Sequence, residues 1–141
     1  MVKKRLVVGL SYKNVDEKLA RTIRATIRSS KDFKDFLIND FQFSPDEIVY
    51  MSDELDENCP KDRDILRKLS FMVRMGKPGD VLVFYFCGHE CRIPARTTKN
   101  NSSFIEYLAT GPTSDGELTM IQDHDFREIV ETVLEKCFEV K

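Results

Sequence analysis

One histidine in the chain, His89, follows an apolar run of β-branched and aromatic residues, Val81 to Phe86, and is introduced by Cys87 and Gly88. Such an uninterrupted run predicts a strand that is buried on both faces. An imidazole exchanges a proton near neutral pH, and open α/β sheets place reactive groups beyond the carboxyl ends of their strands. The pattern therefore indicates His89 as an acid-base group. The alternative is a histidine that only ends a strand and hydrogen-bonds a loop.

Two thiols flank this imidazole, because Cys87 and Cys91 stand on either side of His89 with one residue between. Thiolates are nucleophiles and soft metal ligands, but a structural zinc site usually draws on two separated ligand pairs. Further ligands would have to come from Cys59, His124 or Cys137. Four cysteines in a chain of this size fit reduced thiols better than a disulfide scaffold. We expect neither a metal nor a cofactor.

Composition limits the class of protein. At 141 residues the chain has the length of one domain, residues 1–141, with a single core. Charged residues make up 33% and the net charge is -2, so neither nucleic acid nor an anionic membrane surface is indicated as a partner. No apolar run approaches the roughly 20 residues of a membrane span, and the N-terminal stretch lacks the cleavage site of a secretory signal. We expect a cytoplasmic or nuclear location.

Before the histidine, strand and helix patterns alternate, which predicts α/β architecture with parallel strands. Lys3 to Tyr12 is typical of a buried strand with a close backbone contact at Gly9, and Glu47 to Met51 of a second strand. Lys13 to Ser30 is expected to be loop with some helix. The acidic segment Ser52 to Glu57 is interpreted as solvated surface.

Two helices are expected between these strands. The first would be capped by Ser29 or Ser30 and would turn one apolar face to the sheet: Phe33, Phe36, Leu37 and Phe41. With Phe43, these phenylalanines are interpreted as core. The second would begin at Pro60, end before Gly76 and bury one stripe: Ile65, Leu69, Met72 and Val73.

Beyond the histidine the pattern is looser. Arg92 to Ser103 is polar and predicts a loop, Phe104 to Leu108 a short strand, and Thr110 to Gly116 another loop. A last helix, capped by Asp123 or Asp125, would bury Phe126, Ile129, Val130 and Val133. Cys137 to Lys141 has the composition of the start of a further strand.

Several of these segments, in this order, resemble the large-subunit part of a metacaspase, in the caspase-like clan. They are KRLVVGLSY, the helix that ends in NDFQF, EIVYMSDE, the Pro60 helix with RDILRKL, and KPGDVLVFYFCGHE. The most specific piece is PGD, an apolar strand and then a Gly-His turn. The resemblance covers about residues 3–137. It implies a three-layer αβα sandwich with a mostly parallel central sheet, incomplete at one edge.

The same resemblance implies an activity. Metacaspases are cysteine endopeptidases that use a Cys-His dyad, often require calcium and cut after arginine or lysine. His89 would then be the general base and acid, and the backbone at Gly88 and Glu90 would lie near the oxyanion. Nothing in this sequence supports calcium activation. The acidic segment that usually follows the histidine is replaced by TTKNNSSF, which weakens the expected preference for a basic substrate residue.

This chain departs from the family pattern at its site. The nucleophile motif of the family, Asp-x-Cys-His-Ser-Gly, has no match in the 141 residues, and Cys137 comes too early to provide it. The Asn-Asp pair that lines the family's pocket for a basic side chain falls on Arg28 and Ser29. The serine before Gly-His is Cys87, and the following glycine is Glu90. Ser29 and Cys87 are thus the substrate-pocket positions, and basic specificity is expected to weaken.

Three interpretations remain open. The chain is a catalytically incomplete metacaspase-like domain that acts as a partner or decoy of an active relative, or a large-subunit fragment that needs a second polypeptide. The third is a generic doubly wound α/β binding domain. Against the third, the first strand is followed by no phosphate-binding glycine loop. If a neighbouring strand is missing, the histidine strand should present an open edge for self-association or a protein partner.

Overall fold

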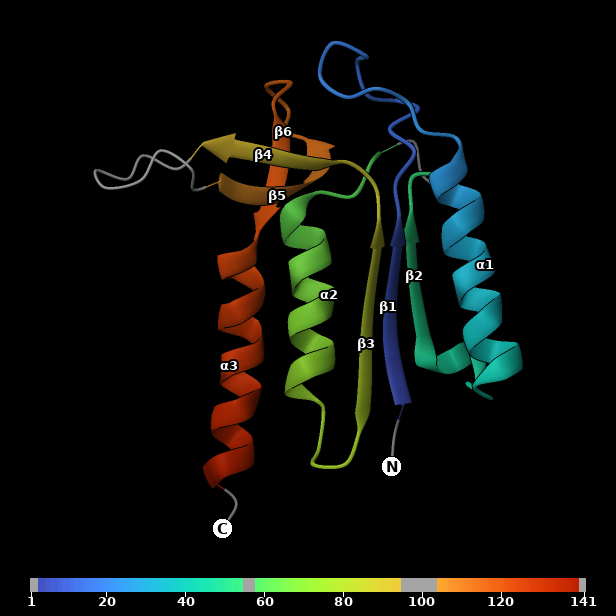
Figure 1. The fold of residues 1–141 in the computed structure, drawn as a ribbon, viewed down its shortest axis with the longest axis vertical. Helices are drawn as coiled ribbons and strands as arrows, with labels where there is room; N and C mark the ends of the chain where they lie inside the picture. Colours follow the sequence, from blue (N-terminus) through green and yellow to red (C-terminus); the bar gives the residue numbers. More distant parts are fainter. Residues whose placement is uncertain (1–2, 55–57, 95–103, 140–141) are drawn as a thin grey trace.

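The computed structural model describes residues 3–54, 58–94 and 104–139, with side chains of the last helix described as far as residue 132. Figure 1 shows its arrangement, in which a small second sheet lies across one end of a three-layer body.

Three parallel strands form the central sheet: β1 (Lys3–Gly9), β2 (Ile48–Ser52) and β3 (Val81–Cys87), in the order β2-β1-β3. The predicted strands and their parallel pairing are confirmed. β3 is an edge strand of the described sheet, and its residues are half-buried or, at Val81, exposed. The prediction that β3 is buried on both faces is therefore wrong, because β1 is its only described strand neighbour.

Helices cover both faces of this sheet. α1 (Ala25–Asp40) lies on one side, and α2 (Asp62–Arg74) and α3 (Asp123–Glu139) lie on the other (Figure 1). Neighbouring residues of a strand point to opposite faces, so Val7 packs in one cluster with Leu37 of α1, whereas Leu6 and Val8 pack in another with Leu69 of α2. The predicted αβα sandwich is confirmed.

α1 begins at Ala25, so Ser29 and Ser30 lie inside the helix and do not cap it. The helix starts early because its first turn is bonded to the sheet: the Thr26 hydroxyl donates to the Leu10 carbonyl at 2.7 Å. Ser30 is buried against Gly9, where a Cβ would collide with the Ser30 side chain. The predicted close contact at Gly9 is therefore confirmed.

The aromatic face of α1 is only partly buried. Leu37 and Phe43 are in the core, and Phe33 stacks on Tyr85 of β3 with 4.1 Å between ring centroids. Phe36 and Phe41, which were expected in the core, are 45% and 52% exposed. They contact each other edge-on beyond Phe33, on the solvent side.

α2 buries the four predicted residues Ile65, Leu69, Met72 and Val73. It begins at Asp62, two residues after Pro60, because two side chains satisfy the backbone groups at its start. The Asp64 carboxylate accepts from the Lys61 amide at 3.1 Å, and the Thr119 hydroxyl accepts from the Asp62 amide at 3.0 Å.

The second sheet is antiparallel and consists of β4 (Glu90–Pro94), β5 (Phe104–Pro112) and β6 (Leu118–Gln122), in the order β4-β5-β6. The sequence predicted only Phe104 to Leu108 of it. β4 was taken for loop because its polar residues face solvent, and β5 continues through Gly111 and Pro112 because that glycine lies against the Cys59 carbonyl, where no Cβ fits. Residues 95–103 lie outside the described residues.

α3 corrects two predictions. Phe126 and Ile129 pack on the core as expected, but Val130 is 49% exposed, and the Val133 side chain lies outside the described residues. Residues 137–139, which resembled the start of a strand, belong to the helix. Among the described residues, none of the helices is sufficiently long and apolar to span a membrane.

Candidate active site

His89 stands between the two sheets, just beyond the carboxyl end of β3 and one residue before β4. The β1–α1 loop (residues 10–24) lies at the same end of the central sheet (Figure 1). Parallel strands bring their carboxyl ends to one edge, so the segments after β1, β2 and β3 meet there. His89 therefore lies where the sequence placed it.

The imidazole of His89 is held by a backbone oxygen. Its Nε2 is 2.6 Å from the carbonyl oxygen of Arg21, in the β1–α1 loop. A carbonyl oxygen can only accept a hydrogen bond, so Nε2 must carry the proton. In the neutral ring the lone pair then belongs to Nδ1, which is the nitrogen able to receive a proton.

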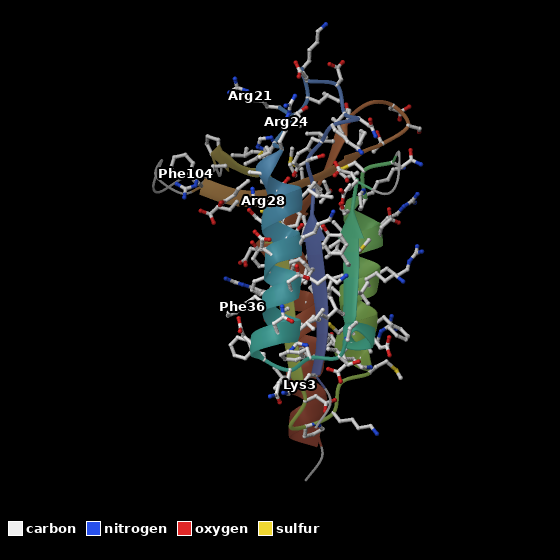
Figure 2. The ribbon with its side chains drawn as sticks, turned by 90° about the vertical axis from the view of Figure 1, so that its right-hand side faces the viewer. Lys3, Arg21, Arg24, Arg28, Phe36 and Phe104 are labelled. Carbon is white, nitrogen blue, oxygen red and sulfur yellow. The ribbon has the colours of Figure 1, made fainter. Side chains whose placement is uncertain are left out.

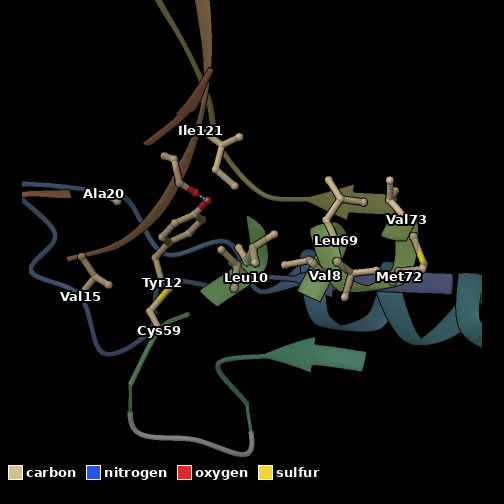
Figure 3. Packing of buried hydrophobic residues seen from close by; sticks show 13 residues of the cluster. Val8, Leu10, Tyr12, Val15, Ala20, Cys59, Leu69, Met72, Val73 and Ile121 are labelled. Carbon is tan, nitrogen blue, oxygen red and sulfur yellow. Dashed lines mark hydrogen bonds between the residues drawn. The ribbon is translucent and has the colours of Figure 1, made fainter. Parts of the chain in front are cut away.

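The main chain of His89 is held by Tyr12, which is fully buried. The Tyr12 hydroxyl accepts from the His89 amide at 2.9 Å. It donates to the Ala109 carbonyl at 2.6 Å, the dashed line at Tyr12 in Figure 3. Because the Ala109 amide also donates to the His89 carbonyl, the hydroxyl replaces one hydrogen bond of the β4–β5 ladder. Burial raises the pKa of Tyr12, which keeps this hydroxyl protonated as a donor.

A buried carboxylate supports the same loop. Asp53 is 1% exposed, although the acidic segment after β2 was predicted to be solvated. Its oxygens accept from the Ser11 amide at 2.9 and 3.1 Å, from the Ser11 hydroxyl at 3.1 Å and from the Tyr12 amide at 2.7 Å. The prediction is wrong for Asp53 because backbone donors compensate for its burial.

Sequence reasoning did not identify Tyr12, Arg21 or Asp53. One signal was present: Asp53 directly follows β2, and Tyr12 and His89 each follow a strand of the same parallel sheet closely. Residues that follow neighbouring parallel strands share an edge of the sheet, so these three side chains could have been grouped. Arg21 acts through its main chain and has no such signal.

The thiols of the described residues form no hydrogen bond with the imidazole, which is bonded to the Arg21 carbonyl. Cys87 ends β3, and Cys91 lies in β4 beside the core, and both are half-buried. Cys59 is buried, and its pKa is raised to about 12 by burial and by Asp53, so it stays a thiol. Residue 137 is in the last turn of α3, whose C-terminal end lies at the opposite end of the body from β4 (Figure 1).

Metal ligands do not gather here. Within residues 3–54, 58–94 and 104–132, no three histidine, cysteine or acidic side chains come together in a way that could hold a metal ion.

The predicted oxyanion positions, Gly88 and Glu90, flank His89. Gly88 lies against the Tyr12 hydroxyl, and a Cβ there would be 2.6 Å from it. Glu90 pairs with Leu108. Hydrogen-bonded and non-hydrogen-bonded pairs alternate along an antiparallel ladder. His89 and Ala109 occupy a hydrogen-bonded position, so Glu90 and Leu108 form a non-hydrogen-bonded pair. The Glu90 amide is therefore directed away from β5.

The predicted substrate-pocket positions lie on the α1 side of β3. Ser29 is exposed and lies one helical turn before Phe33, whose ring stacks on Tyr85 of β3. Cys87 is two residues after Tyr85 in β3, so both side chains point to the face that α1 covers. A cavity of about 850 Å³ lies elsewhere: it is lined by Arg28, Lys31 and Glu54, on the β2 side of α1. Figure 2 shows Arg28 on the outer side of α1. Arg28 therefore faces away from β3, unlike Ser29.

Comparisons with known proteins agree with this arrangement. A family model described as the metacaspase, peptidase C14 domain matches residues 3–139. Metacaspase-7 of Arabidopsis thaliana is 31% identical over 140 residues, which are 97% of this chain and 32% of that protein. Metacaspase-9 of the same plant is 33% identical over 135 residues, 92% of this chain and 39% of that protein. The chain thus spans about a third of the length of these relatives.

A solved structure shows the fold independently. The crystal structure of a Geobacter sulfurreducens protein matches with a TM-score of 0.67 at 13% identity, over 92% of this chain and 44% of that one. The family model and the curated relatives go further than this likeness of fold: the chain belongs to the metacaspase family, peptidase C14.

Proposed function

We propose that these 141 residues form the histidine-bearing part of a caspase-type cysteine endopeptidase site and are catalytically incomplete on their own. The observation that carries this proposal is the orientation of His89, whose Nε2 is bonded to the Arg21 carbonyl. Nδ1 is then the basic nitrogen at the carboxyl edge of the sheet. An imidazole held in this way can take the proton of a thiol and later give it to the leaving amine.

The nucleophile is the missing component. No thiol among the described residues is hydrogen-bonded to His89, and the sequence holds no match to the nucleophile motif of the family. Cys59 is held as a thiol by burial. The thiolate would therefore arrive on a further strand, and the open edge of β3 is the place for it, because a strand added there would end beside His89.

The oxyanion of the tetrahedral intermediate would form near the turn. The Glu90 amide is directed away from the β4–β5 ladder, so it remains a donor for a substrate oxygen. The Gly88 backbone lies against the Tyr12 hydroxyl, which fixes the turn in place. The Glu90 side chain adds a carboxylate that the glycine of the family lacks.

Selection of a basic side chain should be weaker than in the family. Ser29 offers a hydroxyl on the β3 side of α1 where the family pattern has a carboxylate, so a substrate arginine or lysine would lose its ion pair. The guanidinium of Arg28 would not repel such a substrate, because Arg28 lines the cavity on the β2 side of α1. We propose that, once the nucleophile is supplied, the completed site cleaves after arginine or lysine only weakly, and that Ser29→Asp improves this cleavage.

The test is a chimera. The chain would be joined after residue 139 to the segment that follows the matching region in Arabidopsis Metacaspase-9, and assayed with calcium on fluorogenic peptides ending in arginine or lysine. We expect no turnover from the chain alone and turnover from the chimera. His89→Ala should abolish that turnover, whereas His124→Ala should not, since His124 is exposed and pairs only with Glu128 among the described residues. Cleavage by the chain alone that disappears in His89→Ala would refute its incompleteness.

A second function, as a non-catalytic partner, is favoured by one observation. Within the part of the chain that the structure describes, β3 pairs with β1 alone, and the aromatic residues Phe33 and Phe36 lie beside its other edge. Such an edge pairs readily with another strand. A caspase-like protein or a second copy of this chain would be the partner, and adding the chain to an active metacaspase should then change its rate.

A further inference from the structure

We propose that Asp53 and Tyr12 are positioning residues for His89: the buried carboxylate fixes the β1–α1 loop, and this loop then holds both the imidazole and the main chain of His89. The inference rests on the proposed role of His89 as a base. It concerns residues that do not contact a substrate. It adds the requirement that the imidazole is held in one orientation and one tautomer.

The first link is between Asp53 and the start of the loop. Both carboxylate oxygens are used, by the Ser11 amide and hydroxyl and by the Tyr12 amide. Tyr12 has a φ of 60°, in the left-handed region that bulky residues avoid. The hydrogen bonds that the loop donates to Asp53 offset the cost of that conformation, which turns the Tyr12 ring inward.

The second link runs from Ser11 to the imidazole. The carbonyl of Ser11 accepts from the Ile23 amide at 2.8 Å, which closes the loop on itself. Arg21 lies two residues before Ile23, so this bond limits where the Arg21 carbonyl can be. That carbonyl is the acceptor of the His89 Nε2 proton. The carboxylate of Asp53 therefore acts on the far nitrogen of the ring through the main chain of the loop.

The third link runs through the side chain of Tyr12. Its hydroxyl joins the His89 amide to the Ala109 carbonyl, and its ring lies 4.8 Å from the imidazole, centroid to centroid. The backbone position of His89 is thus set by Tyr12, and the rotation of its ring by Arg21. Both contacts begin at the two residues that Asp53 binds.

This double contact has a chemical consequence. A free imidazole exchanges between two tautomers, and only the Nε2-protonated form leaves Nδ1 able to accept a proton from a thiol. Catalytic groups work best when surrounding contacts fix their rotamer and tautomer before the substrate arrives. Asp53 and Tyr12 supply that preorganisation through the β1–α1 loop, without contacting a substrate.

The test reads the tautomer directly and needs no turnover. The chain has two histidines, so the imidazole ¹⁵N signals of His89 can be resolved, with the exposed His124 as an internal reference. We expect His89 to show the Nε2-protonated tautomer with a slowly exchanging Nε2 proton. Tyr12→Phe keeps the ring but removes the hydroxyl, and Asp53→Asn keeps the shape but replaces one acceptor oxygen with a donor.

In both variants we expect the slow Nε2 proton to be lost and the two His89 nitrogen shifts to move toward the averaged values of a free histidine. The matched control is Tyr50→Phe, which removes a hydroxyl bonded to Ser30, on the other side of β1 from β3. It should leave the His89 signals unchanged.

Three results would overturn the inference: wild-type His89 protonated on Nδ1, His89 signals unchanged in folded Tyr12→Phe, or an equal effect of Tyr50→Phe. If Asp53→Asn does not fold, the wild-type and Tyr12→Phe spectra still decide. An inactive chimera with an intact Nε2 tautomer would instead count against the proposed function, so the two proposals fail separately.

Discussion

A Cβ added at Gly88 would lie 2.6 Å from the hydroxyl oxygen of Tyr12 and 2.9 Å from the ring of Phe86. Gly88, in the turn that carries His89, is therefore enclosed between the Tyr12 hydroxyl and the Phe86 ring. Glycine is needed there for space, since its backbone φ is ordinary.

Gly88→Ala should lower the free energy of unfolding by about 1–3 kcal/mol, because an extra methyl group in a closely packed site forces its neighbours to shift. Urea denaturation measures this loss. Combining it with Tyr12→Phe, which removes the oxygen in the way, should cost less than the sum of the two single changes. Strictly additive losses would show that the two residues do not interact.

The thiol of Cys59 should make stability depend on alkaline pH. Its pKa is raised to about 12 by burial and Asp53, so the folded state favours the protonated form. That contribution is complete below the ordinary thiol pKa of about 8.5 and is lost as pH rises toward 12, by up to about 1.4 kcal/mol per pH unit. Urea denaturation between pH 8 and 10 should show this decline. Cys59→Ala should show a shallower one, and equal slopes would contradict the assignment.

Arg5 should destabilise the folded state at neutral pH. Its guanidinium is fully buried over the ring of Phe43, and its nitrogens have no hydrogen-bond partner among the described residues. Burial lowers its pKa to about 10, against the attraction of Glu47. Arg5→Met should raise the free energy of unfolding by about 1–3 kcal/mol, since an unsatisfied buried polar group is removed.

The control for Arg5 is its neighbour Lys4, which points to the opposite face of β1 and is half-buried. Lys4→Met should change the free energy of unfolding by no more than about 0.5 kcal/mol. A loss of stability in Arg5→Met would mean that the guanidinium has a partner in solution.

Phe36 should promote self-association through the open edge of β3. It is 45% exposed, next to Phe33, which stacks on Tyr85 of that strand. Phe36→Lys should shift the chain toward monomer in sedimentation experiments, because a charge beside an open strand opposes pairing. Phe71→Lys is the control: Phe71 is 60% exposed on α2, on the other face of the sheet, and its change should leave the association unaltered.

The parallel sheet and α2 could be predicted because their signals are local and agree. The short apolar run of β3, rich in β-branched and aromatic residues, indicates a strand, and the spacing of Ile65, Leu69 and Met72 indicates a helix. The start of α1 was misplaced because the contacts that extend it, from Thr26 to Leu10 and from Ser30 to Gly9, connect residues 16 and 21 positions apart. No local pattern records them.

The place of His89 in the fold could be predicted for the same reason, because a strand and a glycine directly precede it. The contacts that hold it connect residues 41 to 97 positions apart. Asp53 was assigned to the surface because carboxylates usually are. The second sheet was missed because β4 contains arginine and proline and has its side chains mostly in solvent.

The bond from Tyr12 to Ala109 joins residues 97 positions apart, near opposite ends of the chain. A growing polypeptide that has already completed β3 therefore carries the imidazole and the Arg21 carbonyl that orients it, but it lacks Ala109, the acceptor of the Tyr12 hydroxyl, until β5 has been synthesised. Contacts between such distant segments form late and slowly in folding. We therefore expect the Tyr12 hydroxyl, and with it the main chain of His89, to reach its final position only after β5 has emerged from the ribosome.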